Sequence, residues 1–414
     1  MDLTKEEEKM LHGDYGDVAR KLMEISLKVG EINGAERMIE IKSVHGGGIG
    51  GYREGIGSWG TVGIEVLEAL AEASVKFKVP FSTNVIGMDL SEWRNMGIPE
   101  GFASTQMRVV TAFRKLGAIP GYTCLPYLEE NVPKMGDHVA WVETGVVTMV
   151  NSYTGARSNR ESELTGVAAG ITGRTPEYGY HLKENRYGDV LIKVDTDLNY
   201  ADLGALGFYV GKTGATVPVF EGIPRNINVD KIQQLFGALA MVAPIALAHI
   251  VGVTPEAPTL EEAFGDRRPK ETVMVGRKEL TEAYEALSTA KSRDVDFVMI
   301  GCHFCTVEKI REVTKLLENK KVHENVTLWV QTSSTIRNLA ERDGDVQKIE
   351  RAGGRVYCDS CVLVASMKKY YGFKVMATDS AKMAFAVQGT QYVGMDTLYG
   401  STEKCIEAAV TGRW

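Results

Sequence analysis

The sequence predicts a multi-domain α/β protein in which parallel or mixed sheets are flanked by helices. The chain has 414 residues, whereas single hydrophobic cores stop growing at roughly 250–300 residues. Short apolar runs alternate with helical stretches, most regularly in the last third. We therefore expect α/β domains over residues 1–135, 136–278 and 279–414, the last containing a doubly wound parallel sheet.

The expected elements of the first domain surround a glycine-rich loop at residues 45–57. A strand at residues 38–43 runs into this loop, and a helix at residues 61–74 follows it. The chain then predicts a strand at 75–83, a helix at 104–116 and a strand at 119–124. This order of strands and helices is typical of α/β domains.

The middle of the chain is less regular. It predicts strands at residues 146–151 and 190–194, a helix at 230–248 that Pro244 kinks or ends early, and a proline-containing loop at 252–278. The apolar stretch 235–253 has nearly the length of a membrane span. Because it contains Pro244, His249 and several small residues, we expect a buried core helix instead.

The last third shows the βαβ repetition that predicts parallel strands. The predicted helices and strands are, in order, a helix at 280–288, a strand at 295–301, a helix at 307–317, a strand at 326–331, a helix starting at 335–341, and strands at 354–358 and 373–377.

The charge of the chain limits its partners. The formal net charge is -7, which argues against nucleic acid as the main partner because phosphate binding needs a basic surface. The first ten residues are charged and lack the apolar core of a signal peptide. We therefore expect a cytoplasmic protein with no nucleic-acid and no membrane partner.

Three of the six cysteines fall where a site would form. Parallel α/β sheets bind ligands at the carboxyl ends of their strands. Cys302 and Cys361 follow predicted strands, and Cys124 closes one. Thiolates at such positions bind zinc, copper(I) or iron–sulfur clusters.

The spacing of the cysteines leaves other interpretations open. Cys302 and Cys305 form one C-x-x-C pair, and Cys358 and Cys361 form another, so a four-cysteine zinc site or a redox dithiol is also compatible with the pattern. Burial as small apolar side chains is the alternative without function. A disulfide framework is not expected in a protein without a secretion signal.

The chain resembles the aconitase X family over nearly its whole length. The resemblance rests on ordered motifs: T-C-L-P-Y at residues 123–127, G-D-H-V-A-W at 136–141, N-S at 151–152, G-A-R at 155–157, N-R-E at 159–161, T-P-E-Y-G at 175–179, G-C at 301–302 and D-S-C at 359–361. It implies an aconitase-like iron–sulfur hydro-lyase that lacks the swivelling domain.

By this resemblance Cys124, Cys302 and Cys361 are the cluster ligands. Three ligands suit a 4Fe–4S cluster whose fourth iron binds the substrate as a Lewis acid; a 2Fe–2S or 3Fe–4S cluster is the alternative. The segment after Cys302 departs from the family pattern G-C-P-H-x-S, since His303 and Phe304 stand in place of the proline and histidine.

The resemblance also implies a substrate and a partner. Members with a separate small subunit dehydrate mevalonate 5-phosphate in isoprenoid synthesis, and other members dehydrate cis-3-hydroxyproline. We expect the first reaction, with a small swivelling-domain subunit completing the site. A non-catalytic metal-binding or thiol-redox protein that keeps the fold is the alternative from another class.

Further site candidates come from polar residues in these motifs and at strand ends. Candidate substrate contacts are Lys42, Ser43, Gly47, Gly48, Asn151, Ser152, Arg157, Asn159, Arg160 and Ser333. The glycines offer backbone amides to an anion, and arginine forks bind carboxylates and phosphates. Candidate catalytic residues are His138, from its motif, and Ser380 and Lys382, which resemble a late S-x-K motif of the family.

Overall fold

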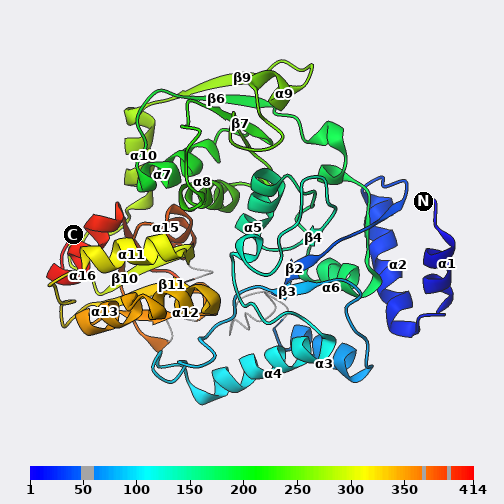
Figure 1. Cartoon of the computed structure of the whole chain (residues 1–414), viewed down its shortest axis with the longest axis horizontal. Helices are drawn as coiled ribbons and strands as arrows, with labels where there is room; N and C mark the ends of the chain where they lie inside the picture. Colours follow the sequence, from blue (N-terminus) through cyan, green and yellow to red (C-terminus); the bar gives the residue numbers. More distant parts are fainter. Residues whose placement is uncertain (48–59, 366–369, 389–392) are drawn as a thin grey trace.

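The computed structural model describes residues 1–47, 60–365, 370–388 and 393–414. Within these residues the chain forms small, mainly parallel sheets with helices packed around them (Figure 1). Helix α8 (Val229–Val242) lies near the centre and packs against α7 (Tyr200–Val210), α5 (Thr144–Met149) and α15 (Ala381–Gln388). It therefore joins parts of the chain that are far apart in sequence.

The N-terminal part is built on a parallel sheet of order β3-β2-β4. The strands are β2 (Val44–Gly46), β3 (Phe81–Thr83) and β4 (Ala140–Trp141), and β1 (Met38–Glu40) pairs antiparallel with β5 (Arg174–Pro176). The helices are α1 (Lys5–His12), α2 (Asp17–Ile32), α3 (Gly60–Glu72), α4 (Glu100–Leu116) and α6 (Glu163–Thr172).

The middle part is a four-stranded parallel sheet of order β8-β7-β6-β9, at the top of Figure 1. The strands are β6 (Val190–Val194), β7 (Pro218–Glu221), β8 (His249–Ile250) and β9 (Glu271–Val275), and α7, α8, α9 (Leu260–Phe264) and α10 (Arg277–Leu287) accompany them. Gly207 lets α7 and α8 approach closely, since an added Cβ there would lie 2.2 Å from the Leu235 carbonyl oxygen.

The C-terminal part is a five-stranded parallel sheet of order β12-β11-β10-β13-β14. The strands are β10 (Phe297–Cys305), β11 (Thr327–Thr332), β12 (Arg355–Tyr357), β13 (Val375–Thr378) and β14 (Asp396–Tyr399); the helices are α11 (Val307–Leu316), α12 (Ser334–Arg342), α13 (Asp345–Ala352), α15 and α16 (Thr402–Thr411). This is the doubly wound topology that the sequence predicts, and its strand order reverses between β10 and β13.

Strand β10 is the centre of this sheet. All nine of its residues are buried, as expected for a parallel strand covered on both faces. Its regular pairing with β11 ends at Ile300 and resumes only at Cys305. Cys302 thus lies within the irregular carboxyl end of the strand rather than after it.

Several predicted elements differ from the observed ones. Residues 146–151 form α5 and a π-helical turn (Val150–Thr154) instead of a strand, because a short apolar run has no periodicity that separates a buried helix from a strand. Residues 119–124 form no strand; Ile119 makes only a single bridge with Ser82. The predicted strand 38–43 is β1 alone, and only the last three residues of 75–83 are extended in a sheet.

The predicted helix at 230–248 is confirmed in its first part, and it ends before Pro244 as expected. Helix α8 ends at Val242, two residues before Pro244, and ten of its residues are buried. Among the described residues, no helix has the length and apolar character to cross a membrane.

Two further predictions differ from the structure. The predicted loop 252–278 also contains α9 and β9. Strand β4 lies after the predicted domain boundary at residue 135, yet it pairs with β2, which lies before it.

Candidate active site

A cavity of about 220 Å³ lies at the carboxyl ends of strands from two sheets. Asn84 follows β3 and Glu143 follows β4, while His303 and Gln331 lie near the ends of β10 and β11. Lys382 lies in the first turn of α15, which follows β13. Met241 of α8 completes one wall. The cavity thus includes the point where the strand order of the C-terminal sheet reverses, which is where open α/β sheets bind ligands.

Cys124, Cys302 and Cys361 all line this cavity. Cys124 lies in a bend before the 3-10 turn Pro126–Leu128, and the Phe304 N–H donates to its Sγ at 3.2 Å. The Cys361 N–H donates to the Ile86 carbonyl oxygen at 3.0 Å, which ties the loop after β12 to the N-terminal part. Three thiols from separate segments therefore meet at one cavity.

The surroundings of Cys124 and Cys302 disfavour ionisation of these two thiols in the absence of a metal. Burial raises the pKa of Cys124 well above its usual range, and burial raises the pKa of Cys302 to about 12. The Ser380 side chain hydrogen-bonds to the Cys302 thiol. A thiol in such a place becomes a thiolate when a metal takes the place of its proton, so the donor set fits a group that carries positive charge at its metal atoms.

The remaining cysteines do not line the cavity. Cys305 packs in the core beneath α11, and Cys405 lies buried in α16. The Cys358 N–H donates to Asp89 Oδ2 at 2.8 Å. Within the described part of the chain, no three His, Cys, Asp or Glu side chains are grouped closely enough to hold a single metal ion. A four-cysteine zinc site from both C-x-x-C pairs is therefore not formed there.

Lys382 carries a positive charge into the cavity. Its Nζ lies 2.6 Å from Glu143 Oε1 and 3.2 Å from His303 Nε2. Burial alone would lower the pKa of Lys382, but the Glu143 carboxylate raises it above the usual value. Burial likewise would raise the pKa of Glu143, and the Lys382 ammonium holds it at about 2. The pair is therefore ionised at neutral pH.

Most of the other predicted site residues lie away from the cavity and hold the fold together. His138 Nδ1 lies 3.0 Å from His181 Nδ1, and Lys42 is exposed. Ser43 accepts from Trp141, and the Gly47 N–H donates to Glu163. Gly48 lies outside the described residues.

The predicted site residues between 151 and 160, and Ser333, also lie away from the cavity and form hydrogen bonds that hold the fold together. Asn151 donates to the Ser158 and Ala246 carbonyl oxygens, and Ser152 accepts from the Ala248 N–H. Arg157 donates to the His181 carbonyl oxygen, Asn159 to that of Tyr178 and Arg160 to that of Ala240. Ser333 caps α12 and hydrogen-bonds Glu129. None of these residues lines the cavity.

Sequence reasoning missed Glu143 and assigned no contact to His303. Glu143 follows β4, which is only two residues long and gives no strand signal of its own. The signal that could have found it is the motif at 136–141, which ends two residues earlier. His303 was noticed only as a departure from the family pattern.

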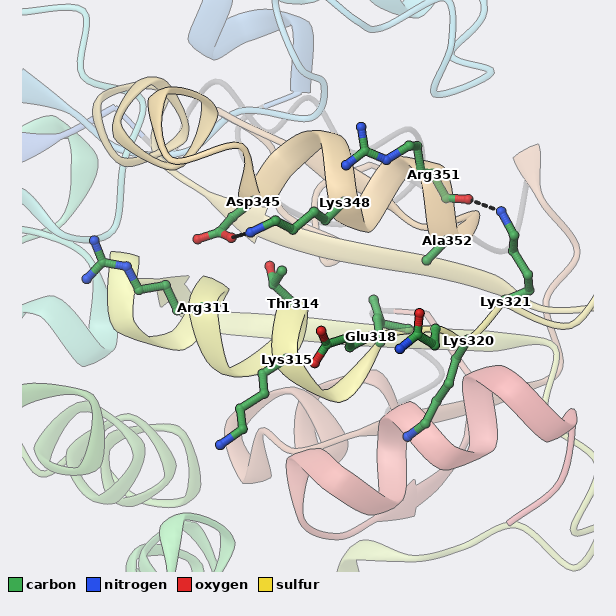
Figure 2. A pocket seen from close by; sticks show the side chains of 12 residues that line it. Arg311, Thr314, Lys315, Glu318, Lys320, Lys321, Asp345, Lys348, Arg351 and Ala352 are labelled. Carbon is green, nitrogen blue, oxygen red and sulfur yellow. Dashed lines mark hydrogen bonds and ion pairs between the residues drawn. The ribbon is translucent and has the colours of Figure 1, made fainter.

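A larger groove of about 730 Å³ lies between α11 and α13, on charged surface residues (Figure 2). Lys348 pairs with Asp345 at 3.0 Å, and Lys321 donates to the Arg351 carbonyl oxygen. None of the predicted site residues lies there. The smaller cavity is therefore the better candidate, because chemistry-bearing side chains converge on it.

Comparison with known proteins gives consistent matches over the whole chain. Family models match as follows: aconitase X first domain over residues 1–184, second domain over 188–285 and third domain over 295–411. The crystal structure of Thermococcus kodakaraensis aconitase X in its holo-form superimposes with a TM-score of 0.87 at 34% identity, covering 99% of this chain and 100% of that chain.

Curated relatives carry two names. The chain is 38% identical to the phosphomevalonate dehydratase large subunit of Methanocaldococcus jannaschii, over 98% of this chain and 100% of that protein. It is 40% identical to the protein of the same name from Methanothermobacter thermautotrophicus, over 96% of each. The cis-3-hydroxy-L-proline dehydratase of Pseudomonas aeruginosa is 30% identical, over 98% of this chain but 70% of that protein.

Proposed function

Because the chain belongs to the aconitase X family, we propose that it is the large subunit of an iron–sulfur hydro-lyase that dehydrates mevalonate 5-phosphate. The observation that carries the chemistry is the meeting of three cysteines and a charged lysine at one buried cavity. The choice of substrate rests on the relatives of 38% and 40% identity, which match this chain over nearly its full length.

The proposed ligands of the cluster are Cys124, Cys302 and Cys361. They fit such a group because their thiols border one space, because Cys124 and Cys302 are buried, and because the Phe304 N–H donates to Cys124. Three cysteine ligands leave one iron of a 4Fe–4S cluster without a protein thiolate, and that iron would supply a Lewis acid for the departing hydroxyl.

The reaction is a β-elimination. A proton leaves the carbon next to the substrate carboxylate, the hydroxyl leaves the following carbon, and a carbon–carbon double bond and water form. The Lys382 ammonium would donate a hydrogen bond to a substrate oxygen in the cavity. Ser380 is fully buried and contacts Cys302 and the start of α15, so we infer that it orients Cys302.

The relatives' names also support a partner. Proteins named as large subunits imply a small subunit, and we propose that a separate swivelling-domain subunit covers the cavity and supplies part of the site. The cavity-lining Lys382 is held as an ammonium that can only donate, so it does not remove the proton. We propose that the group that does so belongs to that subunit.

The test is anaerobic co-purification of the chain with its small subunit, followed by iron and sulfide analysis and a dehydration assay with mevalonate 5-phosphate. We expect cluster in near-stoichiometric amount and release of water from this substrate. A cluster-loaded complex that acts on cis-3-hydroxy-L-proline instead would replace the proposed substrate by that of the second group of relatives. Zinc, or no metal, in the anaerobic preparation would contradict the hydro-lyase proposal.

A further inference from the structure

We propose that Glu143 and His303 are positioning residues that fix the Lys382 ammonium so that one of its N–H groups points to a substrate oxygen. An ammonium has three N–H donors and no acceptor. Two are taken by Glu143 Oε1 at 2.6 Å and by His303 Nε2 at 3.2 Å. Among the described residues, Nζ has no third acceptor, and Lys382 lines the cavity. The role in catalysis rests on the function proposed above.

Glu143 is fixed by the start of helix α5. Its Oε2 accepts the Val146 N–H at 2.6 Å and caps the helix, while its Oε1 holds Lys382. One carboxylate therefore serves two partners in different parts of the chain. A carboxylate held in this way can accept from Lys382 in only a narrow range of directions, which a mobile side chain would not achieve.

His303 is fixed by two glycines on neighbouring helices. An added Cβ at Gly145 of α5 would lie 2.2 Å from His303 Nε2, and one at Gly237 of α8 would lie 2.8 Å from Cε1. The imidazole thus occupies a slot that exists only because both positions lack a side chain. The slot keeps Nε2 next to Lys382, where a neutral imidazole with its proton on Nδ1 accepts one N–H.

The Lys382 ammonium lies near two of the proposed ligand cysteines, which is where a substrate would bind. Cys302 and Cys124 are both electrostatic neighbours of Lys382, so a substrate bound between the thiols and Lys382 would meet the third N–H. Its partner would be an oxygen that carries or gains negative charge, such as a carboxylate oxygen. Removing one such preorganised donor typically lowers kcat by roughly 10²–10³-fold.

The test uses the complete, cluster-loaded complex with Lys382→Ala. This substitution deletes three carbons and the nitrogen, which are the atoms of propylammonium. We expect propylammonium to bind to K382A, measured by ligand-observed NMR, and to restore part of the lost kcat. The added substitutions E143Q or H303L should each weaken this binding and the rescue at least tenfold. Iron content should stay unchanged in every variant.

Two controls separate positioning from general damage. Glu279→Gln also removes a helix-capping carboxylate, the one that accepts the Gly276 N–H in α10, and should leave kcat and propylammonium binding as they are. In the single variants E143Q and H303L, kcat should fall with KM nearly constant.

Equal propylammonium binding in K382A, K382A/E143Q and K382A/H303L would overturn the positioning role. If the unsubstituted complex does not dehydrate mevalonate 5-phosphate, the proposed function fails, and the binding pattern still decides whether Glu143 and His303 hold the ammonium.

Discussion

At the scale of single residues, the three cysteines that line the cavity are more exposed than the other three. Cys124 and Cys302 are each 8% exposed and Cys361 is only partly buried, whereas Cys305, Cys358 and Cys405 are at most 4% exposed. We predict that Cys124→Ala, Cys302→Ala and Cys361→Ala each lose the cluster or make it labile. Iron and sulfide analysis of anaerobic preparations measures this.

The matched control is Cys405→Ala, which removes a fully buried thiol that does not line this cavity. It should keep full iron content, at a cost in stability of about 1 kcal/mol for the lost packing. Loss of iron from the Cys405 variant together with retention in the Cys124 variant would contradict the ligand assignment.

Ionisation of Glu130 should destabilise the folded protein. Burial, together with the negative charge of the nearby Glu129, raises its pKa to about 7. An exposed glutamate ionises near 4.5, so the folded chain holds this proton more tightly. The free energy of unfolding should therefore fall as the pH rises from about 4.5 to 7 and then level off.

We predict that Glu130→Gln increases the free energy of unfolding at pH 8 by about 1–3 kcal/mol and therefore raises the melting temperature. At pH 5 the substitution should change the melting temperature little. Thermal unfolding of both proteins at the two pH values measures this. A variant that is more stable by the same amount at pH 5 and pH 8 would show that ionisation is not the cause.

The sequence predicts some of the residues that line the cavity and misses others. The rule that ligands bind at strand carboxyl ends predicts Cys302 and Cys361, and the family's S-x-K motif predicts Lys382; all three line the cavity. Cys124 also lies there, although the predicted strand before it is absent; Ile119 makes one bridge beside β3, and that contact brings the chain to the same edge. Glu143 could not be selected because β4 is too short to recognise.

At the scale of elements, α5 shows how packing overrides local pattern. Its valines and methionine predict a strand, but all six residues except Thr144 are buried, and Glu143 caps the helix. Helix α8 covers it, as the contacts between the two helices show. A helix buried on nearly every side has no polar face, so its sequence lacks the 3.6-residue period that prediction needs.

The glycine of α5 gives a test at this scale. Gly145→Ala should destabilise the protein by roughly 1–3 kcal/mol because the new Cβ overlaps the confined His303 ring. Gly101→Ala is the control, since an added Cβ at that exposed position in α4 has no atom within 4 Å. It should stabilise by about 0.5–1 kcal/mol. Chemical denaturation of both variants measures the difference, and equal effects would argue against the slot.

Arg186 connects the π-helical turn after α5 with the loop after β8. It donates hydrogen bonds to the turn and forms a buried ion pair with Glu256 of the loop. Arg186, 2% exposed, pairs with Glu256 and donates to Asn151 and Ala156. Arg186→Met should cost roughly 3–5 kcal/mol because Glu256 and several carbonyl oxygens lose their partner. Arg311→Met, which breaks a half-exposed pair with Asp343, should cost no more than about 1 kcal/mol. Urea unfolding compares them; similar losses would mean that the buried network is unimportant.

At the scale of the whole molecule, two parallel sheets turn their carboxyl ends toward one space. The C-terminal sheet was predictable because its strands are apolar runs separated by clear helices, and β10 is buried over its full length. The N-terminal sheet was not, because its strands have two or three residues and most of their stability comes from the helices around them. How the two sheets face each other depends on contacts such as that between Cys361 and Ile86, which no local pattern contains.

The meeting of the three cysteines also fixes an order of events during synthesis. Cys124 leaves the ribosome early, Cys302 much later and Cys361 only near the end of the chain. A nascent chain that stops before Cys361 can fold its first sheet but has no complete set of thiols. If the three cysteines are the ligands as proposed, a complete site exists only after Cys361 has been made, and a chain that stops before it would present Cys124 and Cys302 at most.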